Sequence, residues 1–116
     1  KYFEVVDELR GRGFGVLTFD WRGQGGSGRL LQDIRKGHAR RFDDFQIDLE
    51  TIMTVVGLPD CRPPFYALGH SMGGAALIEA AHAGRTWFDR IVLSAPMIAL
   101  AQVRQPRLVR LFAAAM

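Results

Sequence analysis

The sequence predicts an α/β fold in which three mainly parallel strands alternate with helices. Two observations support this class. Apolar runs of strand length, bounded by glycine or proline, lie at residues 14–20, 65–68 and 91–96. Stretches with a helical pattern lie before or between them, at residues 1–10, 42–56 and 72–84. Strands separated by helices are joined by crossover connections, which make the strands parallel.

The composition is that of a globular domain and excludes several classes of protein. The chain has 116 residues, of which 48% are hydrophobic and 23% charged, without a low-complexity tract or an internal repeat. Its net charge of +3 is too small to indicate nucleic acid by itself. Cys61 is the only cysteine, which excludes an intrachain disulfide and a cysteine cluster for metal. We expect neither a cofactor nor a metal ion.

No targeting feature is visible in the sequence. No signal peptide is visible, and no apolar run approaches the ~18 residues of a membrane-spanning segment. We expect a cytoplasmic protein, with peripheral contact at an anionic membrane as a further expectation. Residue 1 is a lysine and the first residues have the pattern of a helix interior, so we expect the chain to be a fragment.

The first ten residues are predicted to form an amphipathic helix. Charged residues occupy one face, and the other face carries Tyr2, Phe3, Val5, Val6 and Leu9. Gly11 and Gly13 stop this helix. The run at 14–20 follows as a strand that is apolar enough to be buried on both faces.

A glycine-rich loop, DWRGQGGSG, occupies residues 20–28. Gly23, Gly25 and Gly28 satisfy the G-x-G-x-x-G pattern of dinucleotide-binding turns, so a nucleotide-binding domain is an alternative interpretation. Bulky residues precede the turn, however, and no helix opens on the third glycine. We favour a loop that shapes a cleft at the carboxyl end of the strand.

The stretch after this loop is basic. Its cationic residues are Arg29, Arg35, Lys36, Arg40 and Arg41. We interpret the stretch as a solvated face, and contact with anionic lipid or a phosphate headgroup is the alternative.

A helix is predicted over residues 42–56 from the spacing of its apolar residues. Asp43 with Gln46 has the pattern of a capping box, and Phe42 with Ile47 that of a hydrophobic staple. The helix is expected to end at two breakers, Gly57 and Pro59.

The stretch at residues 65–74, FYALGHSMGG, carries the chemical prediction. A strand enters a G-x-S-x-G pattern made of Gly69, His70, Ser71, Met72 and Gly73, and a helix of small residues follows. Such a turn holds its corner residue in strained geometry, and the flanking glycines avoid collisions there. Ser71 is therefore predicted to be a nucleophile at a helix N-terminus, where the helix dipole favours developing negative charge.

The rest of the chain is predicted to hold a third strand and the start of another element. Pro96 ends the strand at 91–96, in which Ser94 is interpreted as structural. A short helix is predicted from Pro106, with apolar residues on one side. The other side carries cations that we expect to contact anionic lipid: Arg104, Arg107 and Arg110.

Three blocks make the chain resemble an α/β-hydrolase, in the branch of lysophospholipases and monoacylglycerol lipases with the serine-aminopeptidase-type domain. They are D-x-R-G-x-G-x-S at residues 20–27, G-H-S-M-G-G at 69–74 and L-S-A-P at 93–96. Together they are most similar to bacterial lysophospholipases. The resemblance implies that residues 1–96 are part of the hydrolase core and that residues 97–116 begin a helical cap.

The resemblance also implies a function and roles for single residues. Ser71 matches the nucleophile, the Met72 backbone N–H matches one oxyanion donor, and Gly69, His70 and Gly73 belong to the elbow. The second oxyanion donor would precede Lys1, and the acid and histidine of the triad would follow Met116. The implied reaction is hydrolysis of lipid acyl esters through an acyl-enzyme, for which residues 1–116 alone would be inactive.

The histidines within the chain are not expected to act as the general base. His82 lies about 16 Å along the helix from Ser71. Alternation sends the His70 side chain away from the hydroxyl, and His38 lies in the basic stretch. Asp20 is interpreted as a loop-organising residue. A non-catalytic binding domain that keeps this fold is the alternative of a different class.

Overall fold

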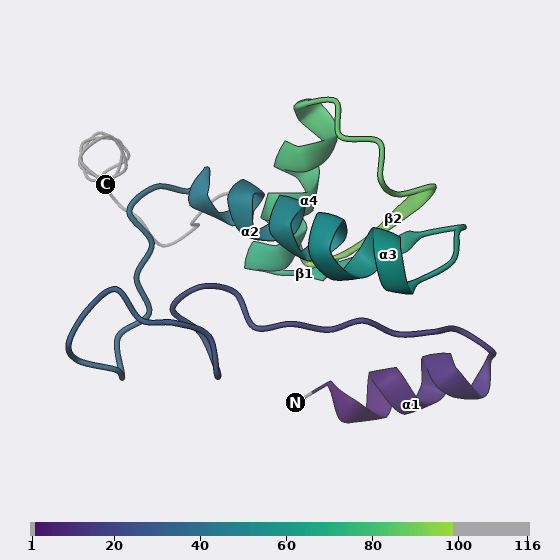
Figure 1. The fold of residues 1–116 in the computed structure, drawn as a ribbon, viewed down its shortest axis with the longest axis horizontal. Coiled ribbons are helices and arrows are strands. Elements are labelled where there is room, and N and C mark those ends of the chain that lie inside the picture. The colour runs from purple at the N-terminus through teal and green to yellow at the C-terminus, as the bar shows by residue number, and fades with distance from the viewer. Residues whose placement is uncertain (1, 99–116) are drawn as a thin grey trace.

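The computed structural model describes residues 2–98, and Figure 1 shows their arrangement. The elements are α1 (Phe3–Gly11), α2 (Asp44–Ile52), the π-helical turn η1 (Met53–Gly57), α3 (Leu58–Asp60), β1 (Tyr66–His70), α4 (Met72–His82) and β2 (Arg90–Ser94). No helix among the described residues is long and apolar enough to span a membrane. The helix predicted from Pro106 and the predicted cap beyond Ile98 lie outside the described residues.

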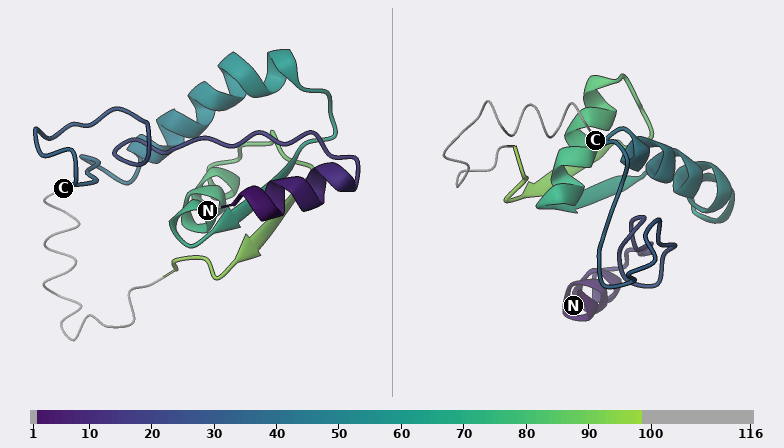
Figure 2. Two further views of the ribbon diagram at one scale, coloured as in Figure 1. Left: turned by 90° about the horizontal axis from the view of Figure 1, so that it is seen from below. Right: turned by 90° about the vertical axis from the view of Figure 1, so that its left-hand side faces the viewer.

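Strands β1 and β2 form a parallel pair, in which Ala67 lies opposite Ile91 and Gly69 opposite Leu93. Helix α4 is the crossover that joins them. Helices α2 and α4 lie together on one side of the pair, and α1 lies on the other (Figure 2). The core fills the space on the side of α2 and α4, and its buried members are Leu49, Met53, Ala67, Leu77 and Ala80.

The prediction of a strand at residues 14–20 is wrong. The segment is extended but pairs with neither strand of the described chain. It is also not buried on both faces, because Phe14 is 45% exposed and Leu17 is 42% exposed. An apolar run indicates a tendency to be buried, whereas a strand also needs a neighbouring strand for its backbone hydrogen bonds. Two parallel strands, rather than three, are present in residues 2–98.

The third predicted strand exists as β2, but it is not buried as expected. Leu68 and Val92, which pair across the strands, are 54% and 58% exposed on the side away from α4. Helix α1 has the predicted amphipathic pattern, yet none of its residues is buried. This face of the sheet is therefore largely uncovered in the described structure.

The helix predicted at 42–56 is longer than expected and is capped differently. Asp43 has helical backbone angles and makes no side-chain cap, and its carboxylate accepts a bond from Arg41 instead. The Gln46 amide donates to the carbonyl of Ala76 and to Glu79 on α4, so no capping box forms. Tertiary partners thus replace the local ones.

The expected hydrophobic staple and helix end are also wrong. Phe42 packs edge-on against Phe45, with ring centroids 5.3 Å apart, and Ile47 is 57% exposed. The helical path continues through Gly57 as η1 and ends only after α3. Pro59 stands in the first turn of α3, a position at which proline is tolerated.

Candidate active site at a strand–helix corner

Ser71 occupies the corner between β1 and α4. It follows the last residue of the strand and precedes the first residue of the helix. Its backbone angles are φ 52° and ψ −118°, a region that residues with a side chain rarely adopt. Such strain costs of order 1–3 kcal/mol and persists only where the surroundings impose it.

Backbone hydrogen bonds hold the corner from both sides. The Ser71 N–H donates to the Ser94 carbonyl at the end of β2, over 3.1 Å. The Ser71 carbonyl accepts from the N–H groups of Met97, at 2.9 Å, and Ala75, at 3.2 Å. The corner is therefore tied to β2, to the segment after β2 and to the first turn of α4, which explains how a strained conformation is maintained.

The glycines around Ser71 differ in how tightly they are packed. A Cβ on Gly69 would lie 2.7 Å from Leu77 Cδ1 and 2.8 Å from Gly74 Cα. A Cβ on Gly74 would lie 2.9 Å from Pro96 Cβ. At Gly73 the nearest atom would be Trp21 Nε1, at 3.8 Å, so this glycine is not needed to avoid a collision. Gly74, which the sequence analysis did not assign, brings β1, α4 and Pro96 together.

The Met72 N–H begins a helix of eleven residues, α4. The first N–H groups of a helix have no intrahelical acceptor, and the helix dipole places partial positive charge there. No backbone hydrogen bond uses the Met72 N–H within the described structure. The group is therefore available to a negatively charged oxygen near Ser71.

None of the three histidines is brought to Ser71 by the described structure. His70 is exposed, and its Nδ1 lies 3.3 Å from Ser94 Oγ on β2. His82 is the last residue of α4, at the end opposite Ser71. The backbone of His38 packs on Gly23, where a Cβ would lie 2.8 Å from the His38 nitrogen. No hydrogen bond joins Ser71 Oγ to a histidine among residues 2–98, and a base from outside these residues stays a prediction.

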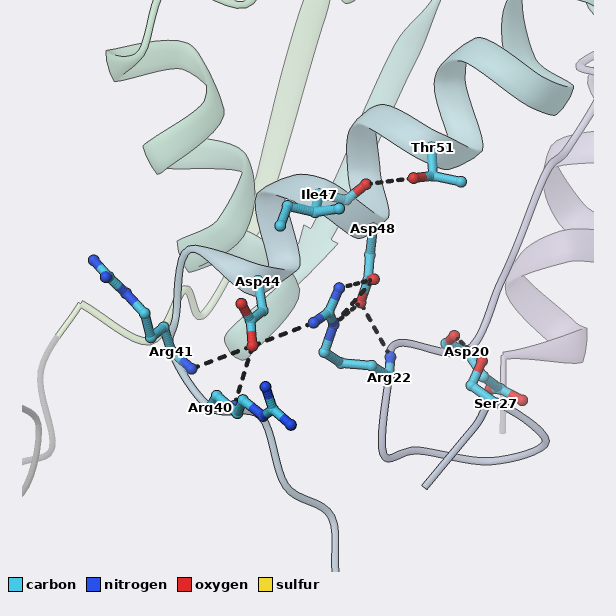
Figure 3. Close-up of polar contacts among 9 residues, drawn as sticks. All are labelled: Asp20, Arg22, Ser27, Arg40, Arg41, Asp44, Ile47, Asp48 and Thr51. Atoms are coloured by element: carbon cyan, nitrogen blue, oxygen red, sulfur yellow. Dashed lines mark hydrogen bonds and ion pairs between the residues drawn. The ribbon is translucent and has the colours of Figure 1, made fainter. Parts of the chain in front are cut away.

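The glycine-rich loop is closed by its own hydrogen bonds. The Asp20 carboxylate accepts from the Gly26 N–H at 2.8 Å. The Asp20 carbonyl accepts from the Ser27 hydroxyl, and Figure 3 draws both of these residues. Gly25 has a positive φ, and a Cβ there would overlap the Asp20 carboxylate. Residues 29–43 contain no helix, so the helix N-terminus that a dinucleotide site requires is absent from this stretch.

Arg22 attaches this loop to α2, a role that the sequence analysis missed. Its guanidinium donates to both oxygens of Asp48 over 2.7–3.0 Å and lies 3.2 Å from Asp44 (Figure 3). The Arg22 N–H also donates to Asp48. The hydrogen bonds that Arg22 donates to Asp48 raise the pKa of Arg22, and the negative charge of Asp48 raises it further. The available signal was the spacing of Asp44 and Asp48, which places both carboxylates on one helix face.

Trp21, next to Arg22, packs between the loop and the elbow. Its ring meets Phe45 edge-on at 5.6 Å between centroids, and its Nε1 is the nearest atom to the side-chain position of Gly73. The attachment of Arg22 to α2 therefore also sets the place of an aromatic ring beside the serine corner.

Replacing Arg22 with glutamine is expected to lower the free energy of unfolding by about 1–3 kcal/mol, because two half-buried carboxylates lose their partner. Urea denaturation of the complete protein measures this change. Arg41→Gln is the matched control, since its pair with Asp43 is 71% and 59% exposed and should contribute below about 1 kcal/mol. Equal losses in the two variants would contradict a stabilising role for the Arg22 pair.

An apolar groove of about 410 Å³ runs along α4 beside the corner. Ala75 and Met97, which bond to the Ser71 carbonyl, both line it. The other lining residues are Phe42, Ile78, Glu79, His82 and Ile98. Such a surface suits an apolar ligand better than a charged one.

Comparison with known proteins identifies the class. The chain matches the serine aminopeptidase S33 family over residues 1–116, and it belongs to that family of α/β-hydrolases. This confirms the resemblance predicted from the three sequence blocks. The family also agrees with the alternating strand and helix order around Ser71.

Three individual relatives are similar in sequence to the chain. Lysophospholipase L2 of Escherichia coli strain K12 is 43% identical over 108 residues, which are 91% of this chain and 31% of that protein. Mouse monoglyceride lipase is 31% identical over 103 residues, covering 84% of this chain and 31% of the relative. The monoacylglycerol lipase of Mycolicibacterium smegmatis is 28% identical over 98 residues. The chain spans about a third of the length of these relatives, and no solved structure matches it.

Proposed function

We propose that the complete protein containing these residues is a serine hydrolase that cleaves acyl esters of lipids, with lysophospholipids or monoacylglycerols as substrates. The observation that carries this proposal is the strained Ser71 at the junction of β1 and α4. The names of the relatives, lysophospholipase and monoglyceride lipase, support the substrate class. The apolar groove beside Ala75 and Met97 offers a surface for an acyl chain.

The proposed reaction has two steps. A histidine from outside the described residues accepts the Ser71 hydroxyl proton as Oγ attacks the ester carbonyl, and the same proton passes to the departing alcohol. Water then attacks the acyl-enzyme, which releases the fatty acid and restores the hydroxyl. The Met72 N–H donates to the oxyanion in both steps, and a second donor from elsewhere in the protein completes the site.

A fluorophosphonate probe tests the assignment of Ser71 in the complete protein. We expect one covalent adduct, located by mass spectrometry on the peptide that contains Ser71, and no adduct in Ser71→Ala. Ser94→Ala is the matched control, because Ser94 Oγ contacts His70 and should not react. An adduct on another serine would contradict the nucleophile, and no adduct at all would favour the non-catalytic binding domain.

A further inference from the structure

A cluster of exposed apolar side chains lies in the loop between the glycine-rich segment and α2. Single exposed apolar residues are ordinary on protein surfaces, whereas here three lie within five positions of one loop, beside a run of cations. Their exposed fractions are 49% for Leu30, 40% for Leu31 and 71% for Ile34. The loop has neither helix nor strand to bury them.

Arg29 holds this loop in shape from within. Its guanidinium donates to backbone carbonyls at 2.7–3.0 Å, on Gln24, Gly25, Ser27 and Ile34. These bonds bridge the glycine-rich segment and the apolar cluster, so the cluster is presented by an ordered loop. Ordering before binding lowers the entropy that a contact must offset.

The same loop carries an excess of positive charge. Residues 28–41 contain five arginine or lysine residues and one carboxylate, Asp33. Asp33 pairs with Arg35 at 3.1 Å and lies 3.9 Å from Lys36, but the two cationic side chains are 87% and 69% exposed. Exposed pairs of this kind contribute little and exchange partners readily. The carbonyls that hold Arg29 leave its charge uncompensated.

The loop projects from the end of the molecule toward which both strands run. Figure 1 shows residues 20–41 at the same end as the start of α4, and Trp21 Nε1 is the nearest atom to the side-chain position of Gly73 in the elbow. A surface bound by this loop would therefore lie on the side of the molecule that carries Ser71.

We propose that residues 29–41 bind the surface of an anionic lipid bilayer, with Leu30, Leu31 and Ile34 inserted among the headgroups and Arg35, Lys36 and Arg40 against lipid phosphates. Apolar side chains flanked by cations match the boundary between acyl chains and anionic headgroups. Nucleic acid would attract the cations, but its phosphate backbone would not bury the apolar side chains. This contact goes beyond the proposed ester hydrolysis and does not depend on it.

Vesicle binding of the complete protein tests this proposal, with Ser71→Ala as background so that lipid is not consumed. On phosphatidylglycerol-containing vesicles, Leu30→Ser/Leu31→Ser/Ile34→Ser should lower the partition coefficient at least about tenfold through lost apolar burial. Arg35→Gln/Lys36→Gln/Arg40→Gln should lower it about a hundredfold, since each of the three cations near an anionic surface contributes roughly fivefold. In this charge variant, vesicle binding should also lose most of its dependence on salt concentration.

The matched control removes three exposed cations elsewhere, Arg10→Gln/Arg12→Gln/Arg62→Gln, with the same change in net charge. It should bind vesicles within about twofold of the parent. An environment-sensitive dye at Ile34→Cys, in a Cys61→Ser background, should shift to shorter wavelength when anionic vesicles are added. Unchanged binding in both loop variants, an equal loss in the control, or no dye shift would overturn the proposal, as would a parent protein that binds no vesicle.

Discussion

Ser71→Ala is expected to lower kcat for a soluble short-chain ester by about 10³-fold or more in the complete protein, because the acyl-enzyme cannot form without the hydroxyl. The soluble substrate removes any effect of membrane binding from the measurement. The fold should be preserved, since Ser71 is exposed and its Oγ makes no hydrogen bond within the described structure. We expect the melting temperature to stay within about 2 °C of the parent.

Ser71→Gly separates the chemical role of this position from its structural one. Glycine adopts φ 52° without steric cost, so this variant should gain about 1 kcal/mol of stability while losing activity as fully as Ser71→Ala. A gain in stability together with a loss of turnover is expected where a functional residue is kept in a strained backbone conformation. If Ser71→Ala kept most of its ester hydrolysis, the nucleophile would be another residue.

Gly69→Ala is expected to lower the free energy of unfolding by about 1–3 kcal/mol, because the new methyl group must displace Leu77 and the backbone of Gly74. The contact joins β1 to α4 directly below the serine corner, so we also expect kcat to fall. Thermal melting and ester hydrolysis of the complete protein measure the two effects.

Gly73→Ala is the matched control for Gly69→Ala. Its methyl group would stand 3.8 Å from Trp21 Nε1, an ordinary contact, and alanine favours a helix over glycine by about 1 kcal/mol. We therefore expect unchanged or slightly higher stability. Equal destabilisation by both substitutions would show that the close packing at Gly69 does not decide the stability of the elbow.

The elbow could be predicted from the sequence because its determinants are local. The apolar run, the glycines on either side of Ser71 and the small residues that follow lie within about 15 positions. The strand, the positive φ of Ser71 and the helix all appear where this pattern indicates. Helix α1 was predictable for the same reason, since its period and its terminating glycines are contained in one short segment.

The features that the sequence analysis missed depend on partners far along the chain. The capping residues Asp43 and Gln46 were available locally, but contacts with Arg41 and with α4 took them instead. The sequence motif contains Arg22 but does not show its partner, because Asp48 lies 26 positions away and only the fold brings the two together.

The sequence by itself determined where Ser71 stands, because a strand–glycine–serine–glycine–helix junction is encoded by neighbouring residues. Only the tertiary structure decided which apolar segments became strands, since a run such as residues 14–20 needs a hydrogen-bonded neighbour as well as a hydrophobic pattern. It also decided that Gly74 rather than Gly73 is closely packed, and that Leu30, Leu31 and Ile34 remain exposed. Packing and exposure depend on all the elements around a residue, and no local pattern contains them.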